Sequence, residues 1–313
     1  MTGTEPPRAP PSGPLRILVT GAGGQLGRSL RARVAESPPP SAAVTFADRT
    51  ALDVTRADRV AAWLDRHPAD VVINAAAYTA VDRAAAEYGR ALAANAEAPG
   101  LLAQACARRG ARLVHVSTDY VFDGRAGRPY TEDDPVGPLN AYGRSKLEGE
   151  RQVLELAPTS LVLRCGWIFS AYGGNFVKTM LRLGRERDTL QVVDDQIGGP
   201  TWAGDLAQVL LELAMQRPAP AGIYHFSGAP WVSWHGFAHE ILRQAMERGL
   251  LERPPVLSAI ATRDRPPAEP RPADSRLDGS KLAERLGGRP APDWRIGLAR
   301  TLDTLAQAPD GLQ

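Results

Sequence analysis

Short apolar runs alternate with amphipathic segments along the first half of this 313-residue chain, and this alternation constrains the fold most strongly. Continuous apolar strands joined by helices are typical of a parallel sheet covered on both faces. We therefore predict an α/β fold built on a doubly wound parallel sheet. The predicted strands are 15–20, 43–48, 70–77, 112–118 and 160–165, and the predicted helices are 25–36, 56–67, 84–108 (adjusted at Pro99-Gly100) and 140–156.

The rhythm loosens after residue 166, where helices are predicted near 174–186, 203–216, 233–248 and 294–307. An apolar run at 190–195 lies among them, and 222–228 predicts a late strand that returns to the sheet. We interpret the proline-rich stretch 263–278 as an ordered loop, with disorder as the alternative. Residues 1–13 are rich in Pro, Gly, Ser and Thr, so we predict a disordered tail there.

Composition excludes several classes of protein. Hydrophobic residues make up 43% and charged residues 23%, which is ordinary for a soluble globular protein, and the net charge of +2 favours neither nucleic acid nor an anionic membrane as partner. Because the chain lacks a spanning apolar run and the apolar core of a secretory signal, we expect a cytoplasmic protein. Cys106 and Cys165 form no Cys/His cluster with zinc-ligand spacing, and His235 and His239 lie four residues apart but lack the intervening Glu of the zincin pattern. We therefore predict no metal and no disulfide framework.

The segment "VTGAGGQLG" follows the first predicted strand and opens the first helix. Gly21 permits a tight turn, Gly24 lets the backbone approach a pyrophosphate, and Gly27 lets helix and strand pack closely. The N–H groups at the helix start, around Gln25 and Leu26, would face the phosphates. A plain tight turn is the alternative, but the strand–turn–helix context indicates a Rossmann-type dinucleotide-binding domain.

We assign residues 14–165 and 201–228 to this dinucleotide-binding domain. Residues 166–200 and 229–308 are assigned to a smaller C-terminal substrate-binding domain, because the regular alternation is lost there.

Asp48 ends the second predicted strand, where a carboxylate would accept the hydroxyls of the adenosine ribose. Its charge favours NADH, whereas Arg49 could pair with the 2′-phosphate of NADPH, so the choice between these cofactors is open. Asp53 and Val54 would lie near the adenine, with capping of the next helix as the alternative for Asp53.

The segment "NAAAYTAVD" follows the third predicted strand. Its small side chains would let the nicotinamide-side ribose and phosphate lie against the backbone, and a simple helix start is the alternative. The candidate cofactor-binding residues in it are Ala75, Ala76, Ala77 and Thr79.

Ser117 and Thr118 end the fourth predicted strand, and open α/β sheets bind ligands at the carboxyl ends of their strands. Tyr142 and Lys146 follow one turn apart on one face of the next helix. A nearby ammonium favours the phenolate and lowers the pKa of a tyrosine, which suits acid–base catalysis. A solvated helix face is the alternative, but with the glycine loop these residues form the constellation of a short-chain dehydrogenase/reductase.

From about residue 15 to about residue 305 the chain resembles the extended short-chain dehydrogenase/reductases, and within them the dTDP-4-dehydrorhamnose reductases. The segments that carry the resemblance are "GAGGQLG", "LDVT", "NAAAYTAVD", "VHVSTDYVFDG", "PLNAYGRSKLEGE", "NFVKTMLRL", "DDQIGGPT" and "RPADSRLD". The resemblance implies an enzyme that uses NADPH or NADH to reduce the 4-keto group of a dTDP-4-keto-6-deoxyhexose. The first expected reaction is that of dTDP-4-dehydro-L-rhamnose to dTDP-L-rhamnose.

The resemblance also implies roles for individual residues. Tyr142 would protonate the developing alkoxide, Lys146 would hold the nicotinamide ribose, and Thr118 would hydrogen-bond the substrate oxygen. Core packing of Trp167 and a solvated Lys178 are alternatives to substrate contacts, and Lys178 or Arg276 would meet the diphosphate. The substrate-binding residues implied are Asp119, Tyr120, Trp167, Asn175, Lys178 and Arg276.

Several positions depart from related proteins. Tyr120 stands where the sugar-nucleotide 4,6-dehydratases have a Glu, so a reductase fits better than a dehydratase. Ala85 and Gly166 replace a usual Glu and a usual Ser or Thr, and Ser29 replaces a Glu that helps some members form a metal-bridged dimer, which leaves a homodimer open. The alternatives are a reductase of a related dTDP-4-keto sugar in antibiotic biosynthesis, such as a dTDP-dihydrostreptose synthase, and a non-catalytic dinucleotide-binding regulatory subunit.

Overall fold

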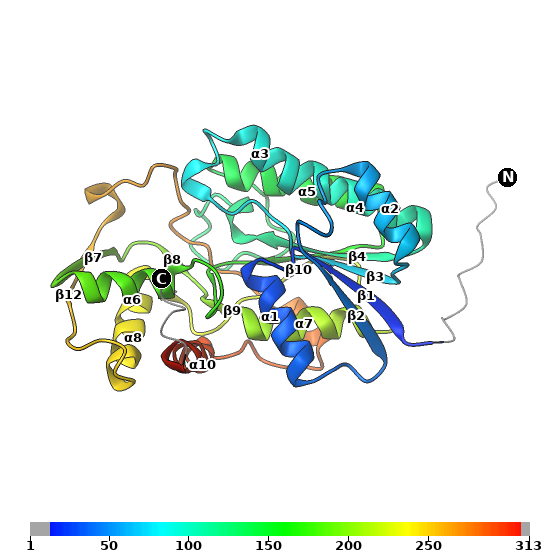
Figure 1. Ribbon diagram of the computed structural model, residues 1–313. Coiled ribbons are helices and arrows are strands. Elements are labelled where there is room, and N and C mark those ends of the chain that lie inside the picture. Colours follow the sequence, from blue (N-terminus) through cyan, green and yellow to red (C-terminus); the bar gives the residue numbers. More distant parts are fainter. Residues whose placement is uncertain (1–12, 308–313) are drawn as a thin grey trace.

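The computed structural model describes residues 13–307, and a six-stranded sheet lies at its centre (Figure 1). All neighbouring strands pair in parallel, in the order β10-β5-β4-β3-β1-β2. The predicted α/β class with a doubly wound parallel sheet is confirmed, whereas all of the predicted tail but Gly13 lies outside the described residues. The strands are β1 (Leu15–Thr20), β2 (Ala42–Ala47), β3 (Val71–Asn74), β4 (Arg112–Thr118), β5 (Leu161–Cys165) and β10 (Gly222–His225).

Helices cover both faces of the sheet because the central strands are apolar on both sides. On one face lie α1 (Gln25–Glu36) and α7 (Ala203–Met215), which appear below the sheet in Figure 1. On the other face lie α2 (Ala57–Arg66), α4 (Ala98–Arg109) and α5 (Ala141–Leu156). Each face has its own apolar cluster, so the sheet is buried as a doubly wound fold requires.

The chain changes direction along the sheet next to β1, because β2 pairs with one edge of β1 and β3 with the other. Such a switch point opens a crevice at the carboxyl ends of the two strands where ligands bind. Thr20 pairs with Asn74 at these ends, and Thr118 pairs with Cys165 two strands further along. The loops that follow β1, β3 and β4 are therefore the ones that can form a site.

A separate apolar cluster lies beyond the sheet, at the left of Figure 1. It is rich in aromatic side chains, among them Phe169, Phe237 and Trp294, and we propose that it is the core of the substrate-binding domain. The helices of this part are α6 (Phe176–Glu186), α8 (Trp234–Glu247) and α10 (Trp294–Gln307), and its strand pairs are β7 (Thr189–Val193) with β12 (Val256–Ile260), β6 (Ile168–Phe169) with β9 (Thr201–Trp202), and β8 (Ile197–Gly198) with β11 (Val232–Ser233). The short helix α9 (Ser280–Arg285) returns to the sheet, where Leu282 packs.

The predicted long helix at 84–108 is wrong in its details. The chain forms the short helix α3 (Tyr88–Leu92), then a π-helical turn (Ala93–Glu97), and then α4, so the irregularity precedes Pro99. The wider turn places Asn95 against α5, where a Cβ on Gly149 would lie 1.9 Å from the Asn95 carbonyl oxygen. Close packing with α5, rather than the proline, accompanies this irregularity.

Candidate active site

The glycine loop after β1 has the geometry that its spacing predicts. Gly21 has a φ of +69°, and a Cβ there would lie 2.5 Å from the backbone nitrogen of Ala76. Gly27 packs so closely that a Cβ would lie 2.3 Å from the Gly21 carbonyl oxygen. Gly24 begins α1 without a side-chain cap, which leaves the first N–H groups of the helix available to an anion. The loop therefore fits the pyrophosphate of a dinucleotide.

Asp48 lies beside this loop, since a Cβ on Gly23 would be 3.6 Å from the Asp48 Cβ. Its Oδ1 accepts hydrogen bonds from Thr50 and from the N–H of Ala51, and these bonds lower its pKa. Arg31 also acts on the Asp48 carboxylate, so a cation other than Arg49 is close to this strand end. The position suits a ribose and does not separate NADH from NADPH.

Asp53 and Val54 do not cap the helix that follows. Asp53 Oδ1 accepts from the Thr55 N–H at 3.1 Å and from its hydroxyl at 2.7 Å, which forms a turn, while the N-cap of α2 is Arg56. Val54 is buried in the apolar cluster under α2. The capping alternative for Asp53 is therefore wrong.

The segment 75–80 is a loop, so the alternative of a simple helix start is also wrong. Ala77 and Thr79 are exposed, while Ala75 and Ala76 are half-buried against the glycine loop. Asn95 fixes this loop: its Oδ1 accepts from the Tyr78 N–H at 2.8 Å and its Nδ2 donates to the Tyr78 carbonyl at 3.0 Å.

Thr118, Tyr142 and Lys146 come together at the carboxyl end of β4. The Thr118 hydroxyl donates to Asp119 Oδ1 at 3.0 Å and lies close enough to the Tyr142 phenol to affect the pKa of that phenol. Lys146 is only 2% exposed, and its Nζ donates to the Val116 carbonyl oxygen at 2.7 Å. The alternative of a solvated helix face is therefore wrong, because the lysine points into the protein.

The pKa of Tyr142 departs from the sequence-based expectation. Desolvation raises it, the nearby Thr118 hydroxyl lowers it, and the charge of Asp119 raises it further. Lys146 is not among the main groups that shift the Tyr142 pKa, and burial lowers the pKa of Lys146 itself to about 8. A phenol that keeps its proton at neutral pH suits a proton donor.

Gly166 makes room for the carboxyl group of Asp119. A Cβ at residue 166 would lie 2.5 Å from the Asp119 Oδ2, so the glycine allows Asp119 to turn inward beside Thr118. Asp119 is 2% exposed; burial raises its pKa to about 6, although bonding to Ser275 and Thr118 lowers it. The Ser275 contact is a loose one, since Oδ2 has no hydrogen bond of normal geometry within the described residues.

Tyr120 packs edge-on against Tyr142, with ring centroids 5.8 Å apart. Its phenol is hydrogen-bonded to Arg271, which also forms an ion pair with Asp82 at 2.8 Å. Arg271 lies in the proline-rich stretch 263–278, and Asn140 Nδ2 donates to the Pro270 carbonyl of the same stretch at 2.8 Å. These contacts order the predicted loop over the site.

Trp167 and Asn175 connect the site to the separate apolar cluster beyond the sheet. Trp167 stacks on Trp234 with centroids 3.5 Å apart, has a φ of +51°, and donates to Ser275 at 3.1 Å. Asn175 caps α6, and its Nδ2 donates at 2.9 Å to Oε1 of Gln25 in the glycine loop. The core-packing alternative for Trp167 is supported by this stacking.

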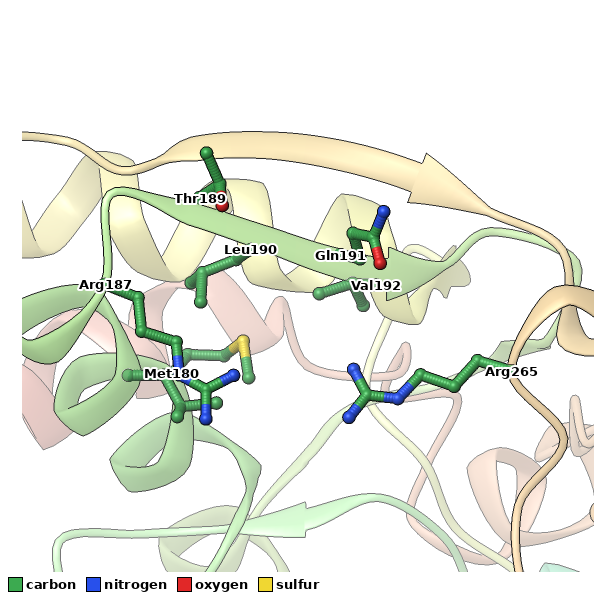
Figure 2. Close-up of a pocket in the computed structure, with 8 residues that line it drawn as sticks. Met180, Arg187, Thr189, Leu190, Gln191, Val192 and Arg265 are labelled. Carbon is green, nitrogen blue, oxygen red and sulfur yellow. The ribbon is translucent and has the colours of Figure 1, made fainter.

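Lys178 and Arg276 are the predicted diphosphate cations. Lys178 is half-buried in the first turn of α6, whereas Arg276 already forms an ion pair with Asp274 at 2.6 Å. A cavity of about 200 Å³ lies instead between α6 and β7, and Figure 2 shows Arg187 and Arg265 pointing toward each other across it. It contains none of the predicted site residues, but it offers two cations to an anionic ligand.

Ser29 donates to the Gln25 carbonyl oxygen at 3.1 Å, so its hydroxyl turns back onto its own helix. Within residues 13–307, no group of three or more His, Cys, Asp and Glu side chains is arranged to hold a metal ion. In the same part of the chain, no helix is both long and apolar enough to cross a membrane. Cys106 and Cys165 are both buried and free.

Comparison with known proteins decides the family. The sequence profile of the family described as "RmlD substrate binding domain" matches residues 15–307. A protein from Aggregatibacter actinomycetemcomitans named dTDP-4-dehydrorhamnose reductase is 46% identical over 287 residues, which cover 90% of this chain and 97% of that protein. The chain belongs to the RmlD family.

Two further proteins are similar to this chain over most of its length. A protein from Streptomyces antibioticus, named probable dTDP-4,6-dihydroxy-2-methyloxan-3-one 4-ketoreductase, is 41% identical over 94% of this chain and 97% of that protein. The crystal structure of dTDP-4-dehydrorhamnose reductase from Bacillus anthracis in complex with NADP has a TM-score of 0.83 and 36% identity, and covers 93% of this chain and 99% of that one.

Several residues of the site had not been predicted. Asn74, Asn95, His115 and Arg271 are buried or half-buried polar residues that hold the loops and Lys146 in place. Asn74 and His115 interrupt otherwise apolar strand segments, "VVIN" and "LVHV", and this interruption was the available signal.

Proposed function

We propose that this chain is an oxidoreductase that reduces the 4-keto group of a dTDP-4-keto-6-deoxyhexose, with dTDP-4-dehydro-L-rhamnose as the first expected substrate and dTDP-L-rhamnose as product. The observation that carries the proposal is the cluster of Thr118, Tyr142 and Lys146 at the carboxyl end of β4, on the same edge of the parallel sheet as the glycine loop after β1. The names of the similar proteins and the match over nearly the whole chain support it.

A reduced nicotinamide dinucleotide, held by the glycine loop and Asp48, would supply the hydride that the carbonyl carbon accepts. The Tyr142 phenol donates its proton to the carbonyl oxygen, and the Thr118 hydroxyl holds that oxygen. Lys146 provides an N–H donor for the cofactor ribose. The hydride and the proton together convert the ketone to the alcohol. Because this group of residues is complete, a non-catalytic regulatory subunit is the weaker alternative.

For the cofactor we propose that both NADPH and NADH are accepted. Asp48 suits the ribose hydroxyls of NADH, while Arg31 and Arg49 next to it offer positive charge to the 2′-phosphate of NADPH. The complex of the Bacillus anthracis relative with NADP supports NADPH. A homodimer stays a prediction.

A second candidate is the reduction of a related dTDP-4-keto sugar in antibiotic biosynthesis, including a dTDP-dihydrostreptose synthase. The similarity to the Streptomyces antibioticus ketoreductase, at 41% identity, favours it. The two candidates share the catalytic cluster and differ in the sugar pocket.

The test is an assay of the full-length protein with a panel of dTDP-4-keto sugars, NADPH and NADH, in which nicotinamide oxidation is followed and the product is identified by mass spectrometry. Tyr142→Phe should lower kcat by about 10²–10⁴-fold while cofactor affinity stays near normal. Tyr88→Phe, at an exposed tyrosine of α3, is the matched control and should behave like the parent. Equal activity of both variants would contradict the proposed role of Tyr142.

A further inference from the structure

His115 is a fully buried histidine to which the proposed function assigns no role. It lies on β4 with 0% exposure, between Asn74 on β3 and Lys146 on α5. Its Nδ1 is 3.1 Å from Asn74 Nδ2, and its Nε2 is 3.4 Å from Lys146 Nζ. A chain of polar contacts therefore runs from the sheet to the lysine.

The orientation of Asn74 determines which nitrogen of His115 carries the proton. Asn74 Oδ1 accepts from the Thr20 hydroxyl at 2.7 Å and from the N–H of Ala76 at 3.1 Å. Because a backbone N–H only donates, this atom must be the amide oxygen, and the NH₂ group faces the ring. The His115 Nδ1 then accepts from Asn74, so the proton of the neutral imidazole is on Nε2.

This assignment has a consequence for Lys146, because the Nε2–H of His115 points at its Nζ. An ammonium has donors only, so it would place N–H against N–H. A neutral amine can accept from His115 with its lone pair while one of its own N–H groups still donates to the Val116 carbonyl, 2.7 Å away. The hydrogen-bond network therefore destabilises the ammonium relative to that of a solvated lysine.

The surroundings of the two groups agree with this assignment. Burial and the charge of Lys146 lower the pKa of His115 well below its usual range, which excludes an imidazolium. Burial also lowers the pKa of Lys146, to about 8, against the opposing charge of Glu150, which is held by Arg164. The titratable or charged groups packed near Lys146 are His115 on β4, Tyr142 and Glu150 on α5, and Arg164 and Cys165 on β5.

We propose that His115 is a positioning residue for Lys146: its Nε2–H holds the lysine nitrogen near the Val116 carbonyl and destabilises the ammonium, so that Lys146 loses its proton more readily than a solvated lysine does. Lys146 then changes its charge close to neutral pH, instead of remaining an ammonium as a solvated lysine does. The importance of this for turnover rests on the proposed function, in which Lys146 holds the cofactor. The proton position does not depend on the substrate.

The first test observes the tautomer directly, so it stays informative even if no keto sugar is turned over. The full-length protein is labelled with ¹⁵N-histidine, and the His115 signals are assigned by their absence in His115→Gln. We expect the Nε2–H tautomer, with no conversion to imidazolium down to about pH 5. A proton on Nδ1, or an imidazolium at neutral pH, would overturn the proposal.

The second test measures the pH dependence of kcat/KM. The proposal assigns the alkaline fall in activity to the loss of the Lys146 ammonium. In His115→Gln the side-chain carbonyl can accept from this ammonium, so the fall should move upward by about one pH unit. Asn74→Asp keeps the histidine, but the new carboxylate accepts from the Nδ1–H of His115 and leaves Nε2 as an acceptor. This variant should therefore also move the alkaline fall in kcat/KM upward. The control is His225→Gln, since His225 is equally buried but bonds the Tyr130 carbonyl. If the alkaline fall in kcat/KM stays at the same pH in both test variants and only kcat is lower, His115 has a structural role and the proposal is refuted.

Discussion

Replacing Glu150 with Gln should destabilise this protein strongly, because it leaves the guanidinium of Arg164 buried without its counter-charge. Both side chains of the pair are 2% exposed. Arg164 Nε and Nη2 donate to the carboxylate at 2.9 and 2.7 Å, and the ring of Phe122 lies 5.0 Å from the guanidinium carbon. The remaining nitrogen, Nη1, has no hydrogen-bond partner in the part of the chain that is described. Among the described residues, Glu150 is the carboxylate that pairs with this guanidinium.

The size of the effect follows from this burial. Removing one partner of a buried ion pair lowers the free energy of unfolding by about 3–5 kcal/mol. Because the Gln amide keeps the shape of Glu150 and one acceptor oxygen, we expect a loss of about 3 kcal/mol for Glu150→Gln. That is a large part of the roughly 5–15 kcal/mol that stabilises a typical domain. The free energy of unfolding should be measured by urea denaturation, with the slope compared to confirm an unchanged transition.

Two controls separate the buried charge from a general effect of the substitution. Arg182 and Glu186 form an exposed pair at 2.8 Å, with side chains 53% and 50% exposed, so Glu186→Gln should cost less than about 1 kcal/mol. The double variant Glu150→Gln with Arg164→Met should recover most of the loss, because the unpaired charge is gone. Equal losses for Glu150→Gln and Glu186→Gln, or a double variant less stable than the single one, would refute this reasoning.

Three further predictions follow from the site. Asp48→Ala should weaken NADH binding more than NADPH binding, as measured by cofactor titration, and equal losses would show that Asp48 does not contact the ribose. Asp119 has a pKa raised by burial from 3.8 to about 6, so its protonated form contributes stability below about pH 4 that is lost as the pH rises through about 6. The free energy of unfolding of Asp119→Asn, minus that of the parent, should therefore increase as the pH rises from about 4 to about 6. A difference that stays constant with pH would contradict the raised pKa of Asp119. Asn95→Ala should cost about 1–3 kcal/mol of unfolding free energy and loosen the Tyr78 loop, whereas an unchanged urea midpoint would show that its bonds contribute nothing.

The sequence by itself determined the class of fold and the position of the cofactor loop. Apolar periodicity predicted the strands of the central sheet and most helices within a few residues. The spacing of Gly21, Gly24 and Gly27 predicted a tight turn, and the structure packs these glycines against backbone atoms. These features depend on residues close together in the chain, where steric and periodic rules act directly. The same is true of Tyr142 and Lys146, which one helical turn places on one helix face.

Only the tertiary structure decided how these groups are surrounded. The helix at 84–108 is interrupted by a π-helical turn where it packs against α5, and Lys146 is buried against His115 rather than solvated. The pKa of Tyr142 is raised where the local pattern indicated a lowering, because burial by distant segments desolvates the phenol. Burial and hydrogen-bond direction arise from contacts between strands and loops far apart in the sequence, and no local pattern encodes them.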